Sequence, residues 1–275
     1  MNNLKNPFQR TTRRCIIGFA LSVLFTVSAN ADDTILFIGK QADHPWGSHM
    51  YLHTCGVLAK SVEQSNRIKT FVSNGWPSDA DRLKDIKAIV VYTNPGAEFL
   101  LDGPGKTQFE KMMKDGVGLV TIHWASTVYE KNFDRLGQRW MGYLGGTWVS
   151  NVGLSIDRSK LTQLDPSHPI CRGWKEYELH DEFYLNPRLS SSAKPFLQVT
   201  TKGEKLVVAW TYERPDGGRS YGTTLGHYYR NFKMNAFRRT IVNAILWTAK
   251  QDIPLNGAHD QMSPKDLELP PKTGK

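Results

Sequence analysis

The sequence has little cysteine, with three residues in a chain of 275. A disulfide framework of the kind that holds small secreted domains together needs more, so the fold must depend on a hydrophobic core. Cys15 lies in the N-terminal apolar stretch, which leaves Cys55 and Cys171 in the rest of the chain. These two could pair in an oxidising compartment. Cys55 lies in a helix-like stretch, however, where a small buried side chain is the simpler interpretation.

Long hydrophobic runs are also scarce. The main one, Cys15 to Val27, is too short to span a bilayer. Basic residues precede it and Ala29-Asn30-Ala31 follows it, which is typical of a secretory signal peptide. We therefore predict a signal peptide over residues 1–31, export to the periplasm or the extracellular space, and no membrane association after cleavage. The segment Thr12 to Ile17 also fits a twin-arginine export signal, with an ordinary secretory start as the alternative.

Positive charge is not concentrated anywhere in the chain. The formal net charge is +9, from 35 Lys+Arg and 26 Asp+Glu. Without the four cations of the leader, 31 basic residues stand against 26 acidic ones, a net charge of +5. The basic residues are scattered singly or in pairs, without the aromatic-interleaved basic stripe of a nucleic-acid-binding protein. No nucleic-acid partner is therefore expected.

Several catalytic and cofactor motifs are missing. Ser126 follows His123 by three residues, but the chain has no G-x-S-x-G elbow for a nucleophilic serine. It has no G-x-G-x-x-G and no P-loop, and the glycine-rich stretch at 142–146 lacks the phosphate-binding lysine. No nucleotide cofactor is therefore expected. His49 and His53 stand one helical turn apart, but no glutamate follows His49, which excludes the zincin motif.

What the chain does have is an alternation of buried strands and amphipathic helices. The short apolar stretches are those of buried parallel strands. The alternation predicts the α/β class, with a three-layer, doubly wound and mainly parallel sheet in a single domain. We expect the domain over residues 32–256, loops and some strand pairing within 130–200, and a polar, disordered tail over 257–275. The expected strands are 34–39, 68–72, 88–92, 117–122, 206–211 and 219–225, and the expected helices are 48–64 with Ser48 as N-cap, 104–114 and 236–248.

Histidines follow several of these strands. His44 and His49 come after the first strand, His123 ends the fourth, and His227 follows the last one after Gly226. Because an open α/β sheet places its chemistry at the carboxyl ends of its strands, His123 and His227 are expected at one edge. The alternatives are a strand-end histidine bonded to a neighbouring carbonyl and histidines that face solvent.

A second polar cluster is the stretch His180-Asp181-Glu182-Phe183-Tyr184. In a strand, Asp181 points opposite to His180 and Glu182. One of the two carboxylates can therefore face a cleft while the other anchors a loop. The alternative is a solvated acidic turn.

Taken in order, these motifs resemble the ThuA-like (trehalose utilisation) family, which has a flavodoxin-like, class I glutamine amidotransferase-like fold. The resemblance covers about residues 34–254 and is greatest to secreted members. It is carried by His44 and His49, 116–123 (G-x-G-L-V-x-I-H), 165–170 (D-P-S-H-P-I), 181–184 (D-E-F-Y), 209–219, 225–227 (L-G-H) and 243–247.

The resemblance also bears on the chemistry. Amidotransferase-like folds place a nucleophilic cysteine on the sharp turn after the strand that ends here at His123, so glutamine hydrolysis through a thiolate is not expected. Many members carry a histidine after the stretch that corresponds to Gly145 to Trp148, whereas Asn151 and its neighbours supply none. Some relatives hold a metal among such histidines.

The activity that the resemblance implies is that of an isomerase, lyase or hydrolase acting on a sugar or a 3-keto-glycoside, with a small-molecule carbohydrate as partner. An imidazole with a pKa near ~6.5 can both take and give a proton at neutral pH. A divalent metal such as Zn²⁺ could instead polarise a keto group. The catalytic candidates are His123, His227, Asp181 and Glu182, and the metal candidates are His49, His123 and His227, with His44 as a further candidate.

Aromatic side chains near these motifs could stack on sugar faces, and an arginine could bond sugar hydroxyls. The substrate-binding candidates are Trp46, Trp124, Tyr184, Tyr228 and Arg219. Core packing, and ion pairing of Arg219 with Glu213 or Asp216, are the alternatives. As a function, the alternative is a non-catalytic carbohydrate- or partner-binding domain, which the missing late histidine favours. An amide or peptide hydrolase would rest on fold analogy alone.

Overall fold

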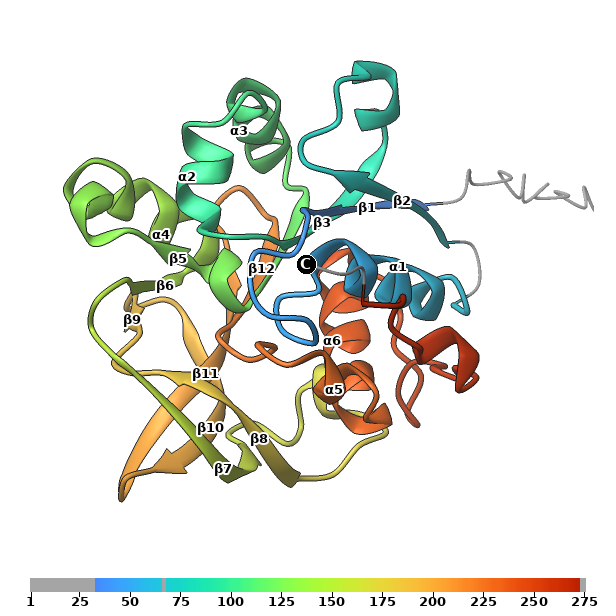
Figure 1. Ribbon diagram of the computed structural model, residues 1–275. Helices are drawn as coiled ribbons and strands as arrows, with labels where there is room; N and C mark the ends of the chain where they lie inside the picture. Colours follow the sequence, from blue (N-terminus) through green and yellow to red (C-terminus); the bar gives the residue numbers. More distant parts are fainter. Residues whose placement is uncertain (1–32, 66–67, 273–275) are drawn as a thin grey trace, which may run out of the picture. The chain divides into compact units, whose positions relative to one another are not determined.

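The computed structural model describes residues 33–65 and 68–272, which belong to one compact unit. Within these residues nine strands form one sheet, in the order β2-β1-β3-β4-β12-β11-β10-β7-β8 (Figure 1). Their bounds are β1 Asp33–Gly39, β2 Ile68–Asn74, β3 Ile86–Tyr92, β4 Gly118–Ile122, β7 Leu154–Gln163, β8 Tyr177–Tyr184, β10 Lys194–Thr201, β11 Glu204–Glu213 and β12 Arg219–Thr223. A small second sheet contains β5 Thr127–Val128, β6 Gly146–Val149 and β9 Arg188–Leu189. The α-helices are α1 Tyr51–Val62, α2 Gly96–Leu101, α3 Lys106–Lys114, α4 Gln138–Leu144, α5 Tyr229–Phe232 and α6 Asn235–Thr248.

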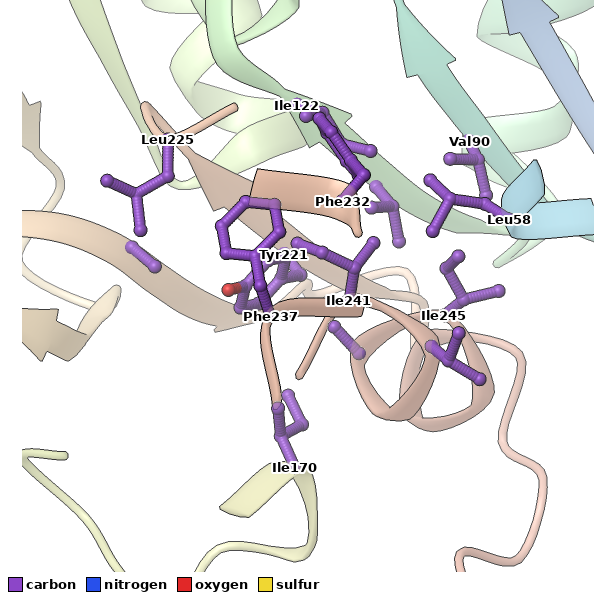
Figure 2. Packing of buried hydrophobic residues seen from close by; sticks show 14 of the residues in the cluster. Leu58, Val90, Ile122, Ile170, Tyr221, Leu225, Phe232, Phe237, Ile241 and Ile245 are labelled. Atoms are coloured by element: carbon purple, nitrogen blue, oxygen red, sulfur yellow. The ribbon is translucent and has the colours of Figure 1, made fainter. Parts of the chain in front are cut away.

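Helices cover both faces of the parallel half of the sheet. Successive residues of β1 point to opposite sides, so Phe37 packs in the cluster with α1 and α6, and Leu36 in the cluster with α2, α3 and α4. Figure 2 shows the first cluster, in which Leu58 of α1, Val90 of β3 and Ile245 of α6 lie together. Strands that are buried on both faces must be apolar throughout, which explains the short apolar stretches of the sequence.

The predicted α/β class and three-layer, single-domain architecture are confirmed, but only half of the sheet is parallel. Strands β2, β1, β3, β4 and β12 pair in parallel, whereas β12, β11, β10, β7 and β8 pair antiparallel. Strands β7, β8 and β10 lie almost entirely within residues 130–200, where we expected loops and some strand pairing. Buried and exposed residues largely alternate along β7, so this strand lacks the all-apolar pattern of the parallel strands.

Two helices differ from their predicted bounds. The first begins at Tyr51, and Ser48 does not cap it but pairs with Tyr228 in an isolated bridge. His49 has left-handed backbone (φ = 46°), which keeps this stretch out of the helix. The predicted helix at 104–114 begins at Lys106, and α2 precedes it. With six residues, α2 is too short to show a helical periodicity in the sequence.

The tail that we predicted to be disordered from Gly257 packs against α1 and α6. Asp260 is buried and forms an ion pair with Arg238, with 3.1 Å between Oδ1 and Nε. The same carboxylate oxygen accepts a hydrogen bond of 2.9 Å from the Ser61 hydroxyl. Four apolar side chains of this tail belong to, or pack against, the first cluster, the one that contains α1 and α6: Ala258, Met262, Leu267 and Leu269. A buried ion pair and a few apolar contacts therefore order a segment whose composition is polar.

The signal peptide predicted over residues 1–31 lies outside the described residues. Among residues 33–65 and 68–272, none of the helices has the length and apolar character that a membrane span requires.

Cys55 and Cys171 are buried and unpaired, so the disulfide considered from the sequence is absent from the described part of the chain. Burial raises the pKa of the Cys171 thiol to about 12. At pH 8 only about 10⁻⁴ of this thiol is then the reactive thiolate, against about a quarter for a free thiol with a pKa near 8.5.

We therefore expect a Cys15→Ser variant to react very slowly with a thiol-specific chromogenic disulfide, and the rate to rise about tenfold for each pH unit between 7 and 9. Both remaining thiols should react promptly once the protein is unfolded in denaturant. A Cys55–Cys171 disulfide found by mass spectrometry, or a native reaction as fast as that of free cysteine, would contradict this expectation.

Removing the Asp260 carboxylate should leave Arg238 charged and buried without its partner. We expect Asp260→Ala to lower the free energy of unfolding by about 3 kcal/mol, measured by urea denaturation. Asp252→Asn, at an exposed position nearby in the chain, is the control and should change it by less than about 0.5 kcal/mol. Equal effects of the two substitutions would mean that the tail contributes little to the fold.

Candidate functional site

Three segments that are far apart in the sequence meet at the carboxyl edge of the parallel strands. His123 directly follows β4, and His227 lies in the loop after β12, the strand beside β4. The loop after β1 reaches the same place by pairing with the loop after β12. The His49 backbone N–H donates to the His227 carbonyl at 3.0 Å, and the Tyr229 N–H donates to the Gly47 carbonyl at 2.9 Å. This pairing places His49 beside His123 and His227.

Unusual backbone geometry aims these histidines inward. His49 (φ = 46°) and His123 (φ = 56°) both adopt left-handed backbone, which is uncommon for residues other than glycine. Gly226, with φ = 111°, supplies a bend that a side chain would not tolerate. Strain of this kind is typical of functional sites. The sharp turn implied after the fourth strand is therefore present, and it carries a histidine.

The three imidazoles present one nitrogen each to a common centre. The distance from His49 Nε2 to His123 Nε2 is 3.0 Å, from His49 Nε2 to His227 Nδ1 3.0 Å, and from His123 Nε2 to His227 Nδ1 3.3 Å. All three side chains are buried or nearly so. The structure thus brings together the three predicted metal candidates, and we call this set the histidine triangle.

Outer partners determine which ring nitrogen of His123 and of His49 carries no hydrogen. The Nδ1–H of His123 donates to the Thr224 carbonyl at 2.7 Å, so its Nε2 carries the lone pair. His49 Nδ1 lies 3.0 Å from the Asp43 carboxylate and 2.7 Å from the Tyr51 hydroxyl. Its Nδ1–H donates to the carboxylate, which leaves the lone pair on Nε2. Two lone pairs therefore face each other within the triangle at 3.0 Å.

The triangle is electrically neutral at ordinary pH. Burial lowers the pKa of His49 to about 2 and that of His227 to about 4, with repulsion from His44 adding to both effects. Burial also lowers the pKa of His123 well below its usual value. Neutral imidazole is the form that binds metal ions.

The residues fit a divalent metal such as zinc. A tetrahedral zinc with bonds of about 2.0–2.1 Å places its nitrogen ligands about 3.3–3.4 Å apart, close to the separations in the triangle. Ligand histidines commonly donate their other N–H to a carboxylate or a backbone carbonyl. Asp43 and the Thr224 carbonyl occupy these outer positions here. His44 lies outside the triangle: its Nδ1 faces Asp43 at 2.9 Å and its ring stacks against His49.

The two neighbouring carboxylates of β8 have different surroundings, as strand alternation predicted. Asp181 is fully buried and accepts hydrogen bonds from the backbone N–H groups of Gly226 (2.7 Å) and His227 (3.1 Å). It therefore anchors the loop rather than facing the cavity. Glu182 lies beside the triangle, with Oε2 3.5 Å from His227 Nδ1 and Oε1 3.9 Å from His123 Nε2. Burial raises the pKa of Asp181 to about 6 and that of Glu182 to about 7.

A cavity of about 420 Å³ is lined by His49 of the triangle together with His44 and Glu182, and we call it the histidine cavity. The Trp148 and Tyr184 rings stack with centroids 4.1 Å apart in its wall, and the Tyr184 hydroxyl lies 3.0 Å from His123 Nε2. Trp124 also lines the cavity. Two of the four predicted aromatic candidates, Trp124 and Tyr184, are therefore in place.

The other substrate-binding candidates do not line the histidine cavity, although the Tyr228 ring packs edge-on against His227 with centroids 4.5 Å apart. Trp46 and Tyr228 line a separate cavity of about 330 Å³, and the Trp46 indole N–H donates to the Pro270 carbonyl. Arg219 begins β12, at the opposite end of that strand from His227, and bonds the Trp247 carbonyl at 3.1 Å. His53, expected on the same helical face as His49, instead contacts the Tyr229 hydroxyl at 3.1 Å. Its position follows from the late start of α1.

Several residues at the site were not predicted. Asp43 and Tyr51 hold His49, and the walls of the histidine cavity include Tyr129, Trp148 and Asn151. The position of Asp43 directly before the candidate His44 is the one sequence signal that pointed to Asp43. Trp148 belongs to β6 and Asn151 to the turn that follows, in a stretch of irregular appearance, so the stacking of Trp148 on Tyr184 of β8 had no signal in the sequence.

A single α/β domain with three clustered histidines at the carboxyl edge of its parallel strands is the class of protein that the fold and the site define. Residues 34–248 match the model of the ThuA family, described as trehalose utilisation, and the chain belongs to this family. None of the curated proteins matches the chain significantly.

Similar folds occur among solved structures. A putative ThuA-like protein from Bacteroides uniformis is 15% identical, with a TM-score of 0.58, and the alignment covers 80% of this chain and 93% of that one. A glutamine amidotransferase from Thermotoga maritima is 9% identical, with a TM-score of 0.47 and coverage of 81% and 100%. The glutaminase domain of CTPS from Trypanosoma brucei is 11% identical, with a TM-score of 0.46 and coverage of 82% and 97%.

We expect the purified protein to bind zinc through the triangle. His49→Ala, His123→Ala and His227→Ala should each weaken the zinc affinity by more than about 100-fold, and Asp43→Ala by about 10- to 100-fold, as the loss of an outer partner does. Competition against a chromogenic chelator measures the affinity. His53→Ala is the matched control and should retain it. Zinc binding that survives His123→Ala unchanged would contradict the assignment.

Proposed function

We propose that this ThuA-family protein is a carbohydrate-processing enzyme that acts on a sugar or a 3-keto-glycoside by acid–base chemistry. The observation that carries the proposal is that Glu182, in the wall of the histidine cavity, lies beside the buried, neutral histidines His123 and His227. His49, His123 and His227 would hold a divalent metal. When bound, the metal would supply a Lewis acid that polarises the keto oxygen of the substrate.

The residues of the chain have separate tasks in this proposal. Glu182 accepts the proton from the carbon beside the keto group, because burial raises the pKa of this carboxyl to about 7 and suits it to proton exchange near neutral pH. As the glycosidic C–O bond breaks, the new carboxylic acid returns the proton to the leaving oxygen. The products are an unsaturated keto sugar and a free alcohol, so atoms and charge balance. Return of the proton to carbon instead would give isomerisation.

The walls of the histidine cavity support a sugar ligand. Trp124 offers a flat apolar surface of the kind that packs against sugar rings, whereas the Tyr184 ring is held between Trp148 and His123. Asp181 supports the chemistry indirectly, because it holds the Gly226–His227 backbone in place. Export through the leader at residues 1–31, and the absence of nucleotide and nucleic-acid partners, stay predictions from the sequence.

One observation favours a second function. Asn151 lines the cavity in the region where the resemblance implied a histidine. If that missing group were essential, the protein would bind carbohydrate without converting it. A single set of measurements separates the two functions.

We expect the zinc-loaded protein to convert 3-keto-trehalose or its methyl 3-ketoglucoside analogue, followed by mass spectrometry and by absorbance of the conjugated enone. Glu182→Gln and His123→Ala should each lower kcat by at least about 100-fold, because proton transfer by a positioned group contributes about 10²–10⁴. The controls are Glu178→Gln, on the same strand but exposed, and His53→Ala. Sugar binding without product in the wild type, unchanged by His123→Ala, would support the binding domain instead.

A further inference from the structure

The separate cavity of about 330 Å³ that Trp46 and Tyr228 line has a different character from the histidine cavity. Its wall also contains Arg230 and Lys233, and none of the described residues that line it is acidic. These four side chains are accessible: Trp46 is 49% exposed, Arg230 and Lys233 are exposed, and Tyr228 is partly exposed. The volume lies at the lower end of the range of ligand pockets, about 300–1,000 Å³, which suits a molecule of one or two rings. We call this cavity the Arg230 cavity.

Three segments that are joined to one another form the Arg230 cavity. Gly47 and Ser48 line it from the loop after β1, Tyr228 from the loop after β12, and Leu269 from the tail. Ser48 and Tyr228 pair in an isolated bridge, so the first two segments hold each other. The Trp46 indole N–H donates to a carbonyl of the tail at 3.2 Å, which joins the third segment to the first. The walls are therefore in place before any ligand binds.

Two positive charges share this cavity. The Arg230 guanidinium lies 4.0 Å from the centre of the Tyr228 ring and donates a hydrogen bond to His180 Nδ1. The Lys233 ammonium lies 5.9 Å from the centre of the Tyr229 ring. Within residues 33–65 and 68–272, neither cation forms an ion pair with a carboxylate. An anionic group in the cavity would supply the counter-charge that both cations lack there.

The rest of the wall indicates what carries the anionic group. The exposed Trp46 ring and the Tyr228 ring offer surfaces on which an aromatic ring can stack. A sugar suits the wall less well, because its hydroxyl groups need several neutral partners. Ser48 is buried, and the Tyr229 hydroxyl already donates to a carbonyl of the tail at 3.1 Å. For the anionic group, a carboxylate matches the planar fork of an arginine, which binds it through two parallel hydrogen bonds.

We propose that the Arg230 cavity binds a small aromatic carboxylate, with its ring against Trp46 and its carboxylate at Arg230 and Lys233. The site is separate from the histidine cavity. The inference therefore does not depend on the function proposed for the histidine cavity.

The test compares three probes by calorimetry on the full chain. The first, 2-naphthoate, has both the aromatic rings and the charge. The second, 2-naphthamide, keeps the rings without the charge, and the third, cyclohexanecarboxylate, keeps the charge without an aromatic ring. We expect 2-naphthoate to bind at least about tenfold more tightly than either of the others, because each of them lacks one of the two interactions.

Variants of the wall assign the binding to this cavity. Arg230→Gln and Lys233→Gln should each weaken the affinity for 2-naphthoate by about tenfold and leave that for 2-naphthamide unchanged. Trp46→Leu should weaken the affinity for both naphthyl probes. Arg188→Gln is the matched control, because Arg188 is also exposed and also stacks on an aromatic ring, 4.3 Å from the centre of the Phe133 ring, but does not line the cavity.

A second control concerns the histidine triangle, where a bound metal could itself attract a carboxylate. His123→Ala should leave the affinity for 2-naphthoate unchanged. Thermal melting confirms that each variant folds, as expected for changes at exposed side chains.

Several outcomes would overturn the proposal. One is a wild type that does not bind 2-naphthoate, or binds it no more tightly than 2-naphthamide. Another is an equal loss of affinity in Arg188→Gln and Arg230→Gln, which would mean that the overall charge of the protein attracts the anion. A loss in His123→Ala would place the ligand at the histidine triangle instead.

Discussion

The site depends on the backbone pairing between the loop after β1 and the loop after β12. Strands β1 and β12 are not neighbours, since β3 and β4 lie between them. The hydrogen bonds from His49 to His227 and from Tyr229 to Gly47 close this gap. Without them His49 would remain over β1, and two histidines at the edge of β4 and β12 would not make a three-ligand centre.

A buried carboxylate holds the other side of this pairing. Asp181 lies on the outermost strand of the antiparallel half, yet its oxygens hold the Gly226 and His227 backbone. Burial without a cationic partner is costly for a carboxylate, and the backbone N–H groups offset that cost only while the loop keeps its bend. Glu182, the residue after Asp181 on β8, is the acidic group beside the triangle. The antiparallel half of the sheet is thus part of the site.

Much of the fold and of the site could be predicted from the alternation of residues along strands and from the positions of strand ends. The fold class, the placement of His123 and His227 at one edge, and the opposite surroundings of Asp181 and Glu182 follow from rules of period and polarity, whereas His49 joins them through the loop pairing. Trp46 and Arg219 do not line the histidine cavity, because proximity in sequence to a site residue does not determine the direction of a side chain after a bend. The ordered tail was missed because one ion pair, Arg238–Asp260, outweighs a polar composition, and pairing of that kind leaves no local pattern.

The tail also bears on when the site can form. It contacts the histidine-bearing loop and its surroundings through the bond from Trp46 to the Pro270 carbonyl and that from Tyr229 to the Leu267 carbonyl. During synthesis the amino-terminal strands emerge first, while the segments that fasten the loop after β1 come more than 170 residues later. The histidine triangle is therefore among the last parts of the molecule to assemble, and a nascent chain that has folded only its first strands lacks the three converging imidazoles.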